Sequence, residues 1–198
     1  MAVEHHAMIP AFNDCGGHNC RFLGFPMLQN RYSVPAWSYL IEDIKPQLIV
    51  EIGCWNGGLS CALGVAMKNY GGRVFCCDIA DFSEDLNDWR RLLPIHFEKL
   101  DALSAHGLHL IGGLIERGGL TVVLCDGGNK PEEFNLYAPF LKQGDIIAAH
   151  DFQHHPHWPF SEINEAQVAN ACAKYSLEPF MNEDMHKAGW LVRRKVKA

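Results

Sequence analysis

Four aspartates stand directly after segments that read as strands, at Asp78, Asp101, Asp126 and Asp151. A further segment of this kind, at 48–53, has no polar alternation, which is typical of a strand buried on both faces of a parallel sheet. In such a sheet, ligands bind beyond the carboxyl ends of the strands. A carboxylate at that edge can accept hydrogen bonds from two hydroxyl groups at once, as a ribose diol presents them. The aspartates therefore predict a ligand site with carboxylates along its rim, and Asp78 is placed for the ribose.

The apolar run at 48–53 leads into a glycine-containing loop, Glu51-Ile-Gly53-Cys-Trp55-Asn-Gly57-Gly58. Its glycine spacing differs from the G-x-G-x-x-G pattern of dinucleotide sites, which disfavours a nicotinamide cofactor. Glycine lets the backbone come close to a ligand, and the Glu51 carboxylate could meet a cationic amino group. An ordinary strand-to-helix turn would also account for Gly53 and Gly57.

Short apolar runs alternate with helical patterns along the chain, which predicts an α/β fold with a mainly parallel sheet. Helical spacing of apolar residues, helix-capping residues and glycine pairs mark the helices between the runs. The last two runs are joined by a short polar stretch, which suits an antiparallel pair. We expect strands at 48–53, 73–77, 95–100, 120–125, 145–150, 177–181 and 189–196, and helices at 36–43, 59–70, 85–93, 104–117, from 131 onward, and at 161–175 after a Ser161 cap.

The composition, with 48% hydrophobic and 20% charged residues in a chain of 198, is that of a globular domain without a membrane span. A net charge of −6 argues against binding to nucleic acid, and the one dense basic run, 193–197, is expected to be the solvated end of the last strand. The start of the chain lacks the pattern of a secretory signal, and six cysteines lie within apolar runs. We therefore expect a cytoplasmic protein with reduced cysteines. The sequence leaves a homo-oligomer open.

The chain resembles the class I S-adenosylmethionine-dependent methyltransferases over residues 24–196. The likeness lies in LIVEIGCWNGG, CDIAD, LCDGG and LKQGDIIAAHDF, and it is strongest to the small-molecule O-methyltransferases and the related cephalosporin hydroxylase-like group. It implies a Rossmann-like, doubly wound, mainly parallel seven-stranded sheet with an antiparallel last strand. Residues 35–198 would form the methyltransferase domain, and residues 1–34 an extension that covers the pocket, with Phe22, Phe25, Met27, Gln29 and Tyr32 as its lining candidates.

The resemblance also implies roles for individual residues toward S-adenosyl-L-methionine. Gly53, Gly57 and Gly58 would line its methionine portion, Asp78 its ribose, and Asp101 with Ala102 its adenine edge, while Trp55 would cover the cofactor or the substrate. Glu51 and Asp126 complete the expected cofactor site. A helix cap is an alternative role for Asp101.

A divalent metal is held in many relatives by carboxylates that fall here on Asp126 and Asp151. Both are hard oxygen ligands suited to Mg²⁺ or Mn²⁺, but His150 stands beside them where sugar-modifying relatives carry an acid. Imidazole suits another transition metal better. For proton removal, the candidates are His150, since histidine as a residue type can act as a base near neutral pH, and Lys130, which stands close to the position of the lysine in catechol-type relatives. In the alternative without a catalytic role, His150 forms a hydrogen bond with the backbone near the pocket, and Lys130 is a solvated residue at the start of a helix.

The function predicted first is O-methylation of a small sugar or phenolic hydroxyl, with or without help from a metal. A metal-dependent hydrolase or hydroxylase using the His-rich segment His154, His155 and His157 is a second hypothesis. A protein that binds S-adenosylmethionine without catalysis is a third, because a fold does not establish an activity.

Overall fold

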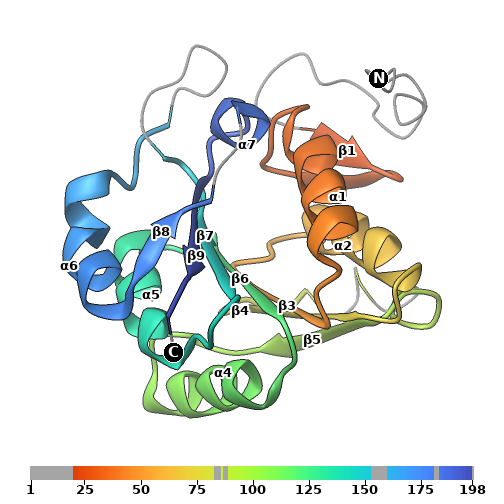
Figure 1. Ribbon diagram of the computed structural model, residues 1–198. Helices are drawn as coiled ribbons and strands as arrows, with labels where there is room; N and C mark the ends of the chain where they lie inside the picture. Colours follow the sequence, from red (N-terminus) through yellow and green to blue (C-terminus); the bar gives the residue numbers. More distant parts are fainter. Residues whose placement is uncertain (1–19, 83–85, 87–88, 153–159, 181–182, 198) are drawn as a thin grey trace.

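The computed structural model describes residues 20–82, 86, 89–152, 160–180 and 183–197. Its centre is a sheet with the strand order β5-β4-β3-β6-β7-β9-β8 (Figure 1). The strands are β3 (Leu48–Ile52), β4 (Arg73–Asp78), β5 (Ile95–Lys99), β6 (Thr121–Cys125), β7 (Ile146–Ala149), β8 (Leu177–Pro179) and β9 (Leu191–Lys195). The strands from β5 to β7 are parallel, and β9 runs antiparallel to both of its neighbours. This confirms the doubly wound, seven-stranded sheet with an antiparallel last strand.

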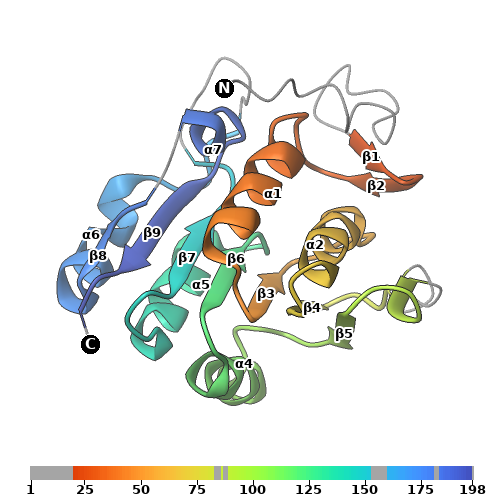
Figure 2. The same ribbon diagram turned by 45° about the vertical axis from the view of Figure 1, so that its right-hand side comes forward.

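Helices cover both faces of the sheet (Figures 1 and 2). Every residue of β3, β6 and β7 is buried. Because successive side chains of a strand point to opposite faces, Ile49 and Val122 pack in one core and Val50 and Val123 in another. The first core includes α1 (Ser33–Ile44), α2 (Gly58–Lys68) and α7 (Glu183–Lys187), and the second includes α4 (Ala105–Arg117), α5 (Lys130–Tyr137) and α6 (Glu165–Tyr175).

Strand order reverses at β3, which pairs with β4 on one side and β6 on the other. The chain runs outward from β3 through β4 to β5 and then returns to β6 on the other side. Such a switch point leaves a crevice at the carboxyl ends of the two central strands, where open α/β sheets bind ligands. The loops after β3 and β6 are therefore the loops that shape the site.

A two-stranded hairpin precedes the sheet and packs against α2 (Figure 2). It consists of β1 (Cys20–Phe22) and β2 (Phe25–Met27) in antiparallel pairing. Phe22 and Met27 are buried within the core that contains α1 and α2. Gly58 allows this contact, because a Cβ on it would lie 2.5 Å from the carbonyl oxygen of Pro26. Residues 20–27 are thus packed onto the domain, while 1–19 lie outside the described residues.

Three local expectations differ from the structure. The polar stretch before β9 contains a helical turn, α7, that the sequence reading took for a loop. The helix expected after Ser161 begins after Asn164, whose side chain accepts from the backbone N–H of Gln167 while the Gln167 side chain accepts from Asn164. This reciprocal capping box satisfies two N–H groups, which explains why the helix starts there. The helix expected at 85–93 is described only in part, with Leu86 among its helical residues.

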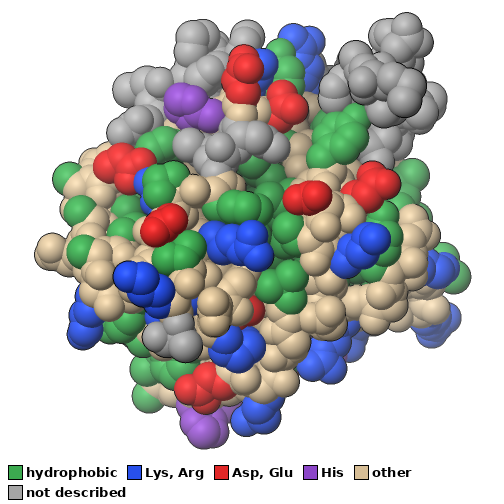
Figure 3. Space-filling model, viewed as in Figure 1, with side chains coloured by type: hydrophobic (Ala, Val, Ile, Leu, Met, Phe, Trp, Pro, Cys, Tyr) green, Lys and Arg blue, Asp and Glu red, His purple; other side chains and the backbone are tan. Residues whose placement is uncertain are grey.

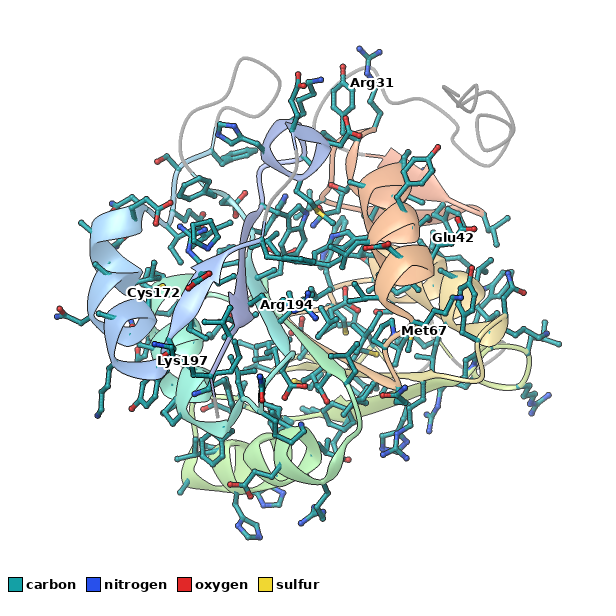
Figure 4. All side chains as sticks on the ribbon, viewed as in Figure 1. Arg31, Glu42, Met67, Cys172, Arg194 and Lys197 are labelled. Atoms are coloured by element: carbon teal, nitrogen blue, oxygen red, sulfur yellow. The ribbon has the colours of Figure 1, made fainter. Side chains whose placement is uncertain are left out.

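The basic run near the C-terminus is also different from the solvated strand end that was expected. Arg193 is buried and pairs with Glu165, and Lys195 is nearly buried with its ammonium over the ring of Tyr175. Arg194, labelled in Figure 4, lies over the ring of Phe180. The run therefore belongs to the packed strand β9, because the stems of arginine and lysine pack well on apolar and aromatic surface.

Charged side chains of both signs are interspersed on the face drawn in Figure 3. None of the helices in the described part of the chain combines the length and apolar character needed to cross a bilayer. The cysteines whose side chains are described are free thiols: Cys54, Cys61, Cys76, Cys77, Cys125 and Cys172.

Candidate functional site

Two adjoining cavities lie at the carboxyl ends of the central strands. Cavity A, of about 420 Å³, is lined by residues that include Glu51, Lys130, His150 and Asp151. Cavity B, of about 460 Å³, is lined by residues that include Asp78, Asp101, Ala102 and Glu133. Both cavities are lined by Leu28, Gly53, Trp55 and Asp126. A ligand that spans both would cross the loops after β3 and β6.

The loop after β3 depends on Gly53. Its φ of +80° is a left-handed conformation that glycine adopts without steric cost. A Cβ at this position would lie 2.4 Å from the carbonyl oxygen of Asp126 and 2.5 Å from the Cα of Gly127. Gly53 therefore brings the two loops together at the point where the cavities meet.

Gly57 and Gly58 have other contacts in the structure. Gly57 also has a positive φ, +77°, and faces the side chain of Leu86, while Gly58 faces β2. Neither is among the described residues that line cavity A or cavity B. Their expected contact with the methionine portion of a cofactor stays a prediction, whereas their packing roles follow directly from the space around them.

Asp78 ends β4 and is held by backbone donors. Its Oδ2 accepts from the N–H of Trp55 at 3.0 Å, and its Oδ1 accepts from the N–H of Ala80 at 3.0 Å. A carboxylate oxygen accepts more than one hydrogen bond, so both oxygens keep capacity for a ligand hydroxyl. Trp55 has a φ of +43° and lines both cavities. Its expected role as a cover for the cofactor or the substrate stays a prediction.

Asp101 and Ala102 line cavity B and are absent from the described lining of cavity A. The Oδ1 of Asp101 accepts from the N–H of Leu103 at 2.9 Å. The cap of α4 is Ser104, whose hydroxyl accepts from the N–H of Gly107. Asp101 therefore forms a tight turn before the cap, rather than the cap itself, and remains on the cavity wall.

Glu51 is buried in the wall of cavity A. Its carboxylate accepts from the hydroxyl of Ser60 at 2.5 Å. Burial raises the pKa of Glu51 well above its usual value, and the neighbouring Cys76, Asp126 and Asp78 raise it further. A cationic ligand group nearby would favour the ionised carboxylate, so this residue is suited to an amino group.

The acidic centre of cavity A consists of Asp126 after β6, His150 and Asp151 after β7, and Lys130 at the start of α5. His150 Nδ1 lies 3.1 Å from Asp126 Oδ1 and 3.4 Å from Asp151 Oδ1. Lys130 Nζ lies 2.9 Å from Asp151 Oδ2 and 3.8 Å from Asp126 Oδ1. Glu162 supplies a further carboxylate at 2.7 Å from Lys130 Nζ. The chain folds so that three elements far apart in sequence converge on one ammonium.

Lys130 is a cation in this arrangement. Burial by itself lowers the pKa of Lys130, but the carboxylates of Asp126, Asp151 and Glu162 outweigh burial and raise the pKa above its usual value. A lysine base needs the opposite shift to act near neutral pH. The structure therefore argues against Lys130 as the proton-removing residue.

His150 contributes its imidazole ring to the same acidic centre. Its Nδ1 points to the carboxylates, its Nε2 is buried, and its ring lies against Trp190 with centroids 4.6 Å apart. With Asp126 as acceptor, Nδ1 is assigned the proton, which makes His150 a partner of that carboxylate. Asp126 lines both cavities, whereas His150 lines cavity A alone.

Gln29 completes the surroundings of Asp126. This buried side chain donates from Nε2 to Asp126 Oδ2 at 2.7 Å, and its Oε1 accepts from the hydroxyl of Ser33 at 2.9 Å. Burial raises the pKa of Asp126, while His150 and Lys130 lower it, with a net upward shift. Gln29 and His150 thus hold Asp126 in one orientation, and its carboxyl is a weaker acid than an exposed aspartate.

Two acids at this site carried no recognisable signal in the sequence. Glu162 lies beyond a stretch, 153–159, that is outside the described residues, and only the folded chain brings it to Lys130. Glu133 is buried and accepts from the N–H groups of Gly127 and Asn129, so it organises the loop that lines cavity B. Its place in the first turn of α5 was visible, but the direction of its side chain was not.

The metal expected at Asp126, His150 and Asp151 can be tested against this geometry. One ligand atom from each lies within 4.8 Å of the others, so the set does converge. The ammonium of Lys130 already contacts two of these carboxylates. A divalent ion and an ammonium about 4 Å apart repel each other by about 8 kcal/mol at an effective dielectric constant of about 20. The residues therefore do not fit a divalent ion while Lys130 holds this position. The histidines at 154, 155 and 157 lie outside the described residues.

Comparison with protein-family models and with curated proteins finds no match. Among solved structures, the chain is similar to the apo structure of CmcI-N160, with a TM-score of 0.65 and 16% identity over 90% of this chain and 76% of that one. It is similar to the Mg-SAM structure of cmcI-D160, with a TM-score of 0.61 and 16% identity over 88% and 75%. It is also similar to the SAH-bound Podospora anserina methyltransferase PaMTH1, with a TM-score of 0.53 and 15% identity over 82% and 77%. The strand order and these similarities together show that the chain has the Rossmann-like fold of the class I methyltransferases.

Proposed function

We propose that this protein is an S-adenosylmethionine-dependent methyltransferase that acts on a hydroxyl group of a small molecule. The observation that carries the proposal is the meeting of cavities A and B at Gly53, Trp55 and Asp126. Cavity B offers the carboxylates of Asp78 and Asp101 for a nucleoside. Cavity A offers the buried acid Glu51 and the pair of Asp126 and His150, which could take up a proton. The structural neighbours include forms solved with SAM or SAH, which is consistent with a donor bound at the same edge of the sheet.

The adenosine part of the donor would occupy cavity B. Asp78 would accept from the ribose hydroxyls, because both of its oxygens are fixed by backbone N–H groups and keep acceptor capacity. Asp101 and Ala102 would flank the adenine edge. Glu51 and Asp126 would face the amino group from cavity A, where burial makes an unpaired carboxylate costly and a cationic partner favourable. Trp55 would cover the junction.

The acceptor would occupy cavity A. Its wall is mostly apolar, from Met27, Leu28, Leu59 and Phe160, with the polar groups of the acidic centre at one end. A pocket of this kind orients a small, uncharged or aromatic molecule through a few polar contacts. Because Met27, Leu28 and Gln29 come from the segment before α1, we propose that the described part of this segment, residues 20–32, forms the acceptor side of the site; the rest of the expected extension, residues 1–19, lies outside the described residues.

Bound S-adenosylmethionine supplies a methyl group on a sulfonium for in-line attack by the acceptor oxygen. The protein aligns the two reactants across the junction of the cavities, which removes most of the entropic cost of bringing them together. Asp126 would accept the proton of the acceptor hydroxyl as that oxygen takes up the methyl group and S-adenosylhomocysteine is left as the product. His150 and Gln29 hold Asp126 in position for that transfer. The acceptor class that we favour is a sugar or phenolic hydroxyl, and we place the reaction in the cytoplasm.

The test has two stages on the purified protein. Calorimetry with S-adenosylmethionine and S-adenosylhomocysteine measures donor binding, and transfer of a radiolabelled methyl group to a panel of sugars and phenols measures activity. We expect binding in both cases and transfer to at least one class, with Asp126→Asn abolishing transfer more than binding. Absence of donor binding at millimolar concentration would refute the proposal. Binding with no transfer to any hydroxyl would favour a non-catalytic binding protein instead.

A further inference from the structure

The ammonium of Lys130 is held by more acceptors than an ordinary surface lysine. It donates to the carbonyl oxygen of Gly127 at 3.1 Å, to Asp151 Oδ2 at 2.9 Å and to Glu162 Oε2 at 2.7 Å. Asp126 Oδ1 lies 3.8 Å away. These contacts use the three N–H donors of an ammonium and surround it with oxygen, which is the environment that a hard cation prefers.

The burial of this group makes its charge important. The Lys130 side chain is 6% exposed, and those of Asp126 and Asp151 are 14% and 11% exposed. Carboxylates so close together and so poorly hydrated need a positive partner to stay ionised. Within the described residues, Lys130 is the lysine or arginine that supplies the positive charge to this centre.

We propose that the Lys130 ammonium is the resident cation of the centre formed by Asp126, His150 and Asp151, that it excludes divalent metals from it, and that loss of this ammonium turns the centre into a divalent-metal site. The same three residues offer one ligand atom each, and these atoms lie within 4.8 Å of one another. Carboxylates, with water completing the shell, are ligands suited to Mn²⁺. If the protein transfers methyl groups as proposed above, the reaction needs no added metal. Only this consequence rests on the proposed function.

The direct test measures Mn²⁺ binding by electron paramagnetic resonance, without donor or acceptor. We expect no stoichiometric binding to the wild-type protein after treatment with a chelator. Lys130→Met keeps an unbranched side chain, one atom shorter, and removes the charge. We therefore expect one Mn²⁺ per chain with an affinity at least about 100-fold higher than that of the wild type, because the repulsion is gone. Lys130→Arg keeps a cation and should behave as the wild type.

A second lysine gives a matched control. Lys142 pairs with Asp145 at 2.8 Å before the start of β7, whereas His150 and Asp151 follow its end, so Lys142→Met removes an ammonium from an ion pair without exposing a converging ligand set. We expect no gain of Mn²⁺ affinity in this variant. Adding Asp126→Asn to Lys130→Met should abolish the gained affinity and thereby locate the ion.

Stability measurements keep the proposal testable if Lys130→Met folds poorly. The variant should have a lower Tm than the wild type in chelator and should recover it with Mn²⁺, whereas the wild-type Tm should not respond to Mn²⁺. Tight, stoichiometric Mn²⁺ binding to the wild type would overturn the proposal. A folded Lys130→Met with no more Mn²⁺ affinity than Lys142→Met would also overturn it. Because neither readout uses methyl transfer, failure of the proposed function would leave this result intact.

Discussion

Replacement of Gly53 by alanine should both destabilise the protein and damage the site. A non-glycine residue in the left-handed region costs about 1–2 kcal/mol. The new Cβ would also lie 2.4 Å from the carbonyl oxygen of Asp126, and overpacking of this kind costs about 1–3 kcal/mol. We therefore expect Gly53→Ala to lose about 2–5 kcal/mol of unfolding free energy. Because Gly53 lines both cavities, the affinity of the variant for S-adenosylhomocysteine should be at least about tenfold lower than that of the wild type, a loss of about 1.4 kcal/mol of binding free energy.

Gly71→Ala separates the two causes. Gly71 has a similar φ, +71°, but a Cβ there would meet nothing within 4 Å. This variant should show the backbone cost alone and keep its affinity for S-adenosylhomocysteine. At about 3 °C per kcal/mol for a domain of this size, the extra contact cost predicts a Tm about 3–9 °C lower for Gly53→Ala than for Gly71→Ala. Calorimetric unfolding and titration of the two variants measure both quantities. Equal Tm values, or equal affinities, would refute the close approach of the two loops.

Three further predictions follow from the structure. Asn164→Ala removes the N-cap of α6 and should lower the free energy of unfolding by about 1 kcal/mol. Ser161→Ala should leave Tm within about 1 °C of the wild type. A larger loss of stability in Ser161→Ala than in Asn164→Ala would show that the helix starts at the predicted Ser161 cap. Burial raises the pKa of Glu133 to about 7 from 4.5, so the folded state keeps a proton that the unfolded chain releases, and stability should fall between pH 4.5 and 7 by about 3 kcal/mol. Urea unfolding at pH 5 and 8 should show this fall reduced in Glu133→Gln, and an equal fall in both proteins would contradict the assignment. Glu51→Gln should weaken S-adenosylmethionine binding at least about tenfold without lowering Tm, because the buried site then no longer offers a negative charge; unchanged affinity would remove Glu51 from the donor site.

The fold could be predicted from the sequence because its signals are local. The buried run at 48–52 has no polar alternation, and similar runs recur at β4, β6 and β7, so a mainly parallel sheet could be predicted from the pattern. The doubly wound, seven-stranded form was predicted from the resemblance to the methyltransferases, and the observed strand order agrees with it. The carboxylates at the ends of the predicted strands were placed on one edge, because parallel strands end at the same edge of a sheet. Helix starts were less certain, since Ser161 and Asn164 are both good caps and only the observed hydrogen bonds choose between them.

The chemistry of the site was decided by the tertiary structure. The sequence shows that Lys130 follows Asp126 by four residues, but it does not show that Glu162 and Asp151 close around the same ammonium. It likewise places His150 beside Asp151 without revealing that the imidazole turns toward Asp126 and buries its other nitrogen. These facts depend on contacts between residues far apart in the chain, and the free energy of an ionised group depends on all its neighbours at once. The sequence alone therefore predicts at which edge of the sheet the candidate site lies, and the packed structure shows that the ammonium of Lys130 lies among its carboxylates.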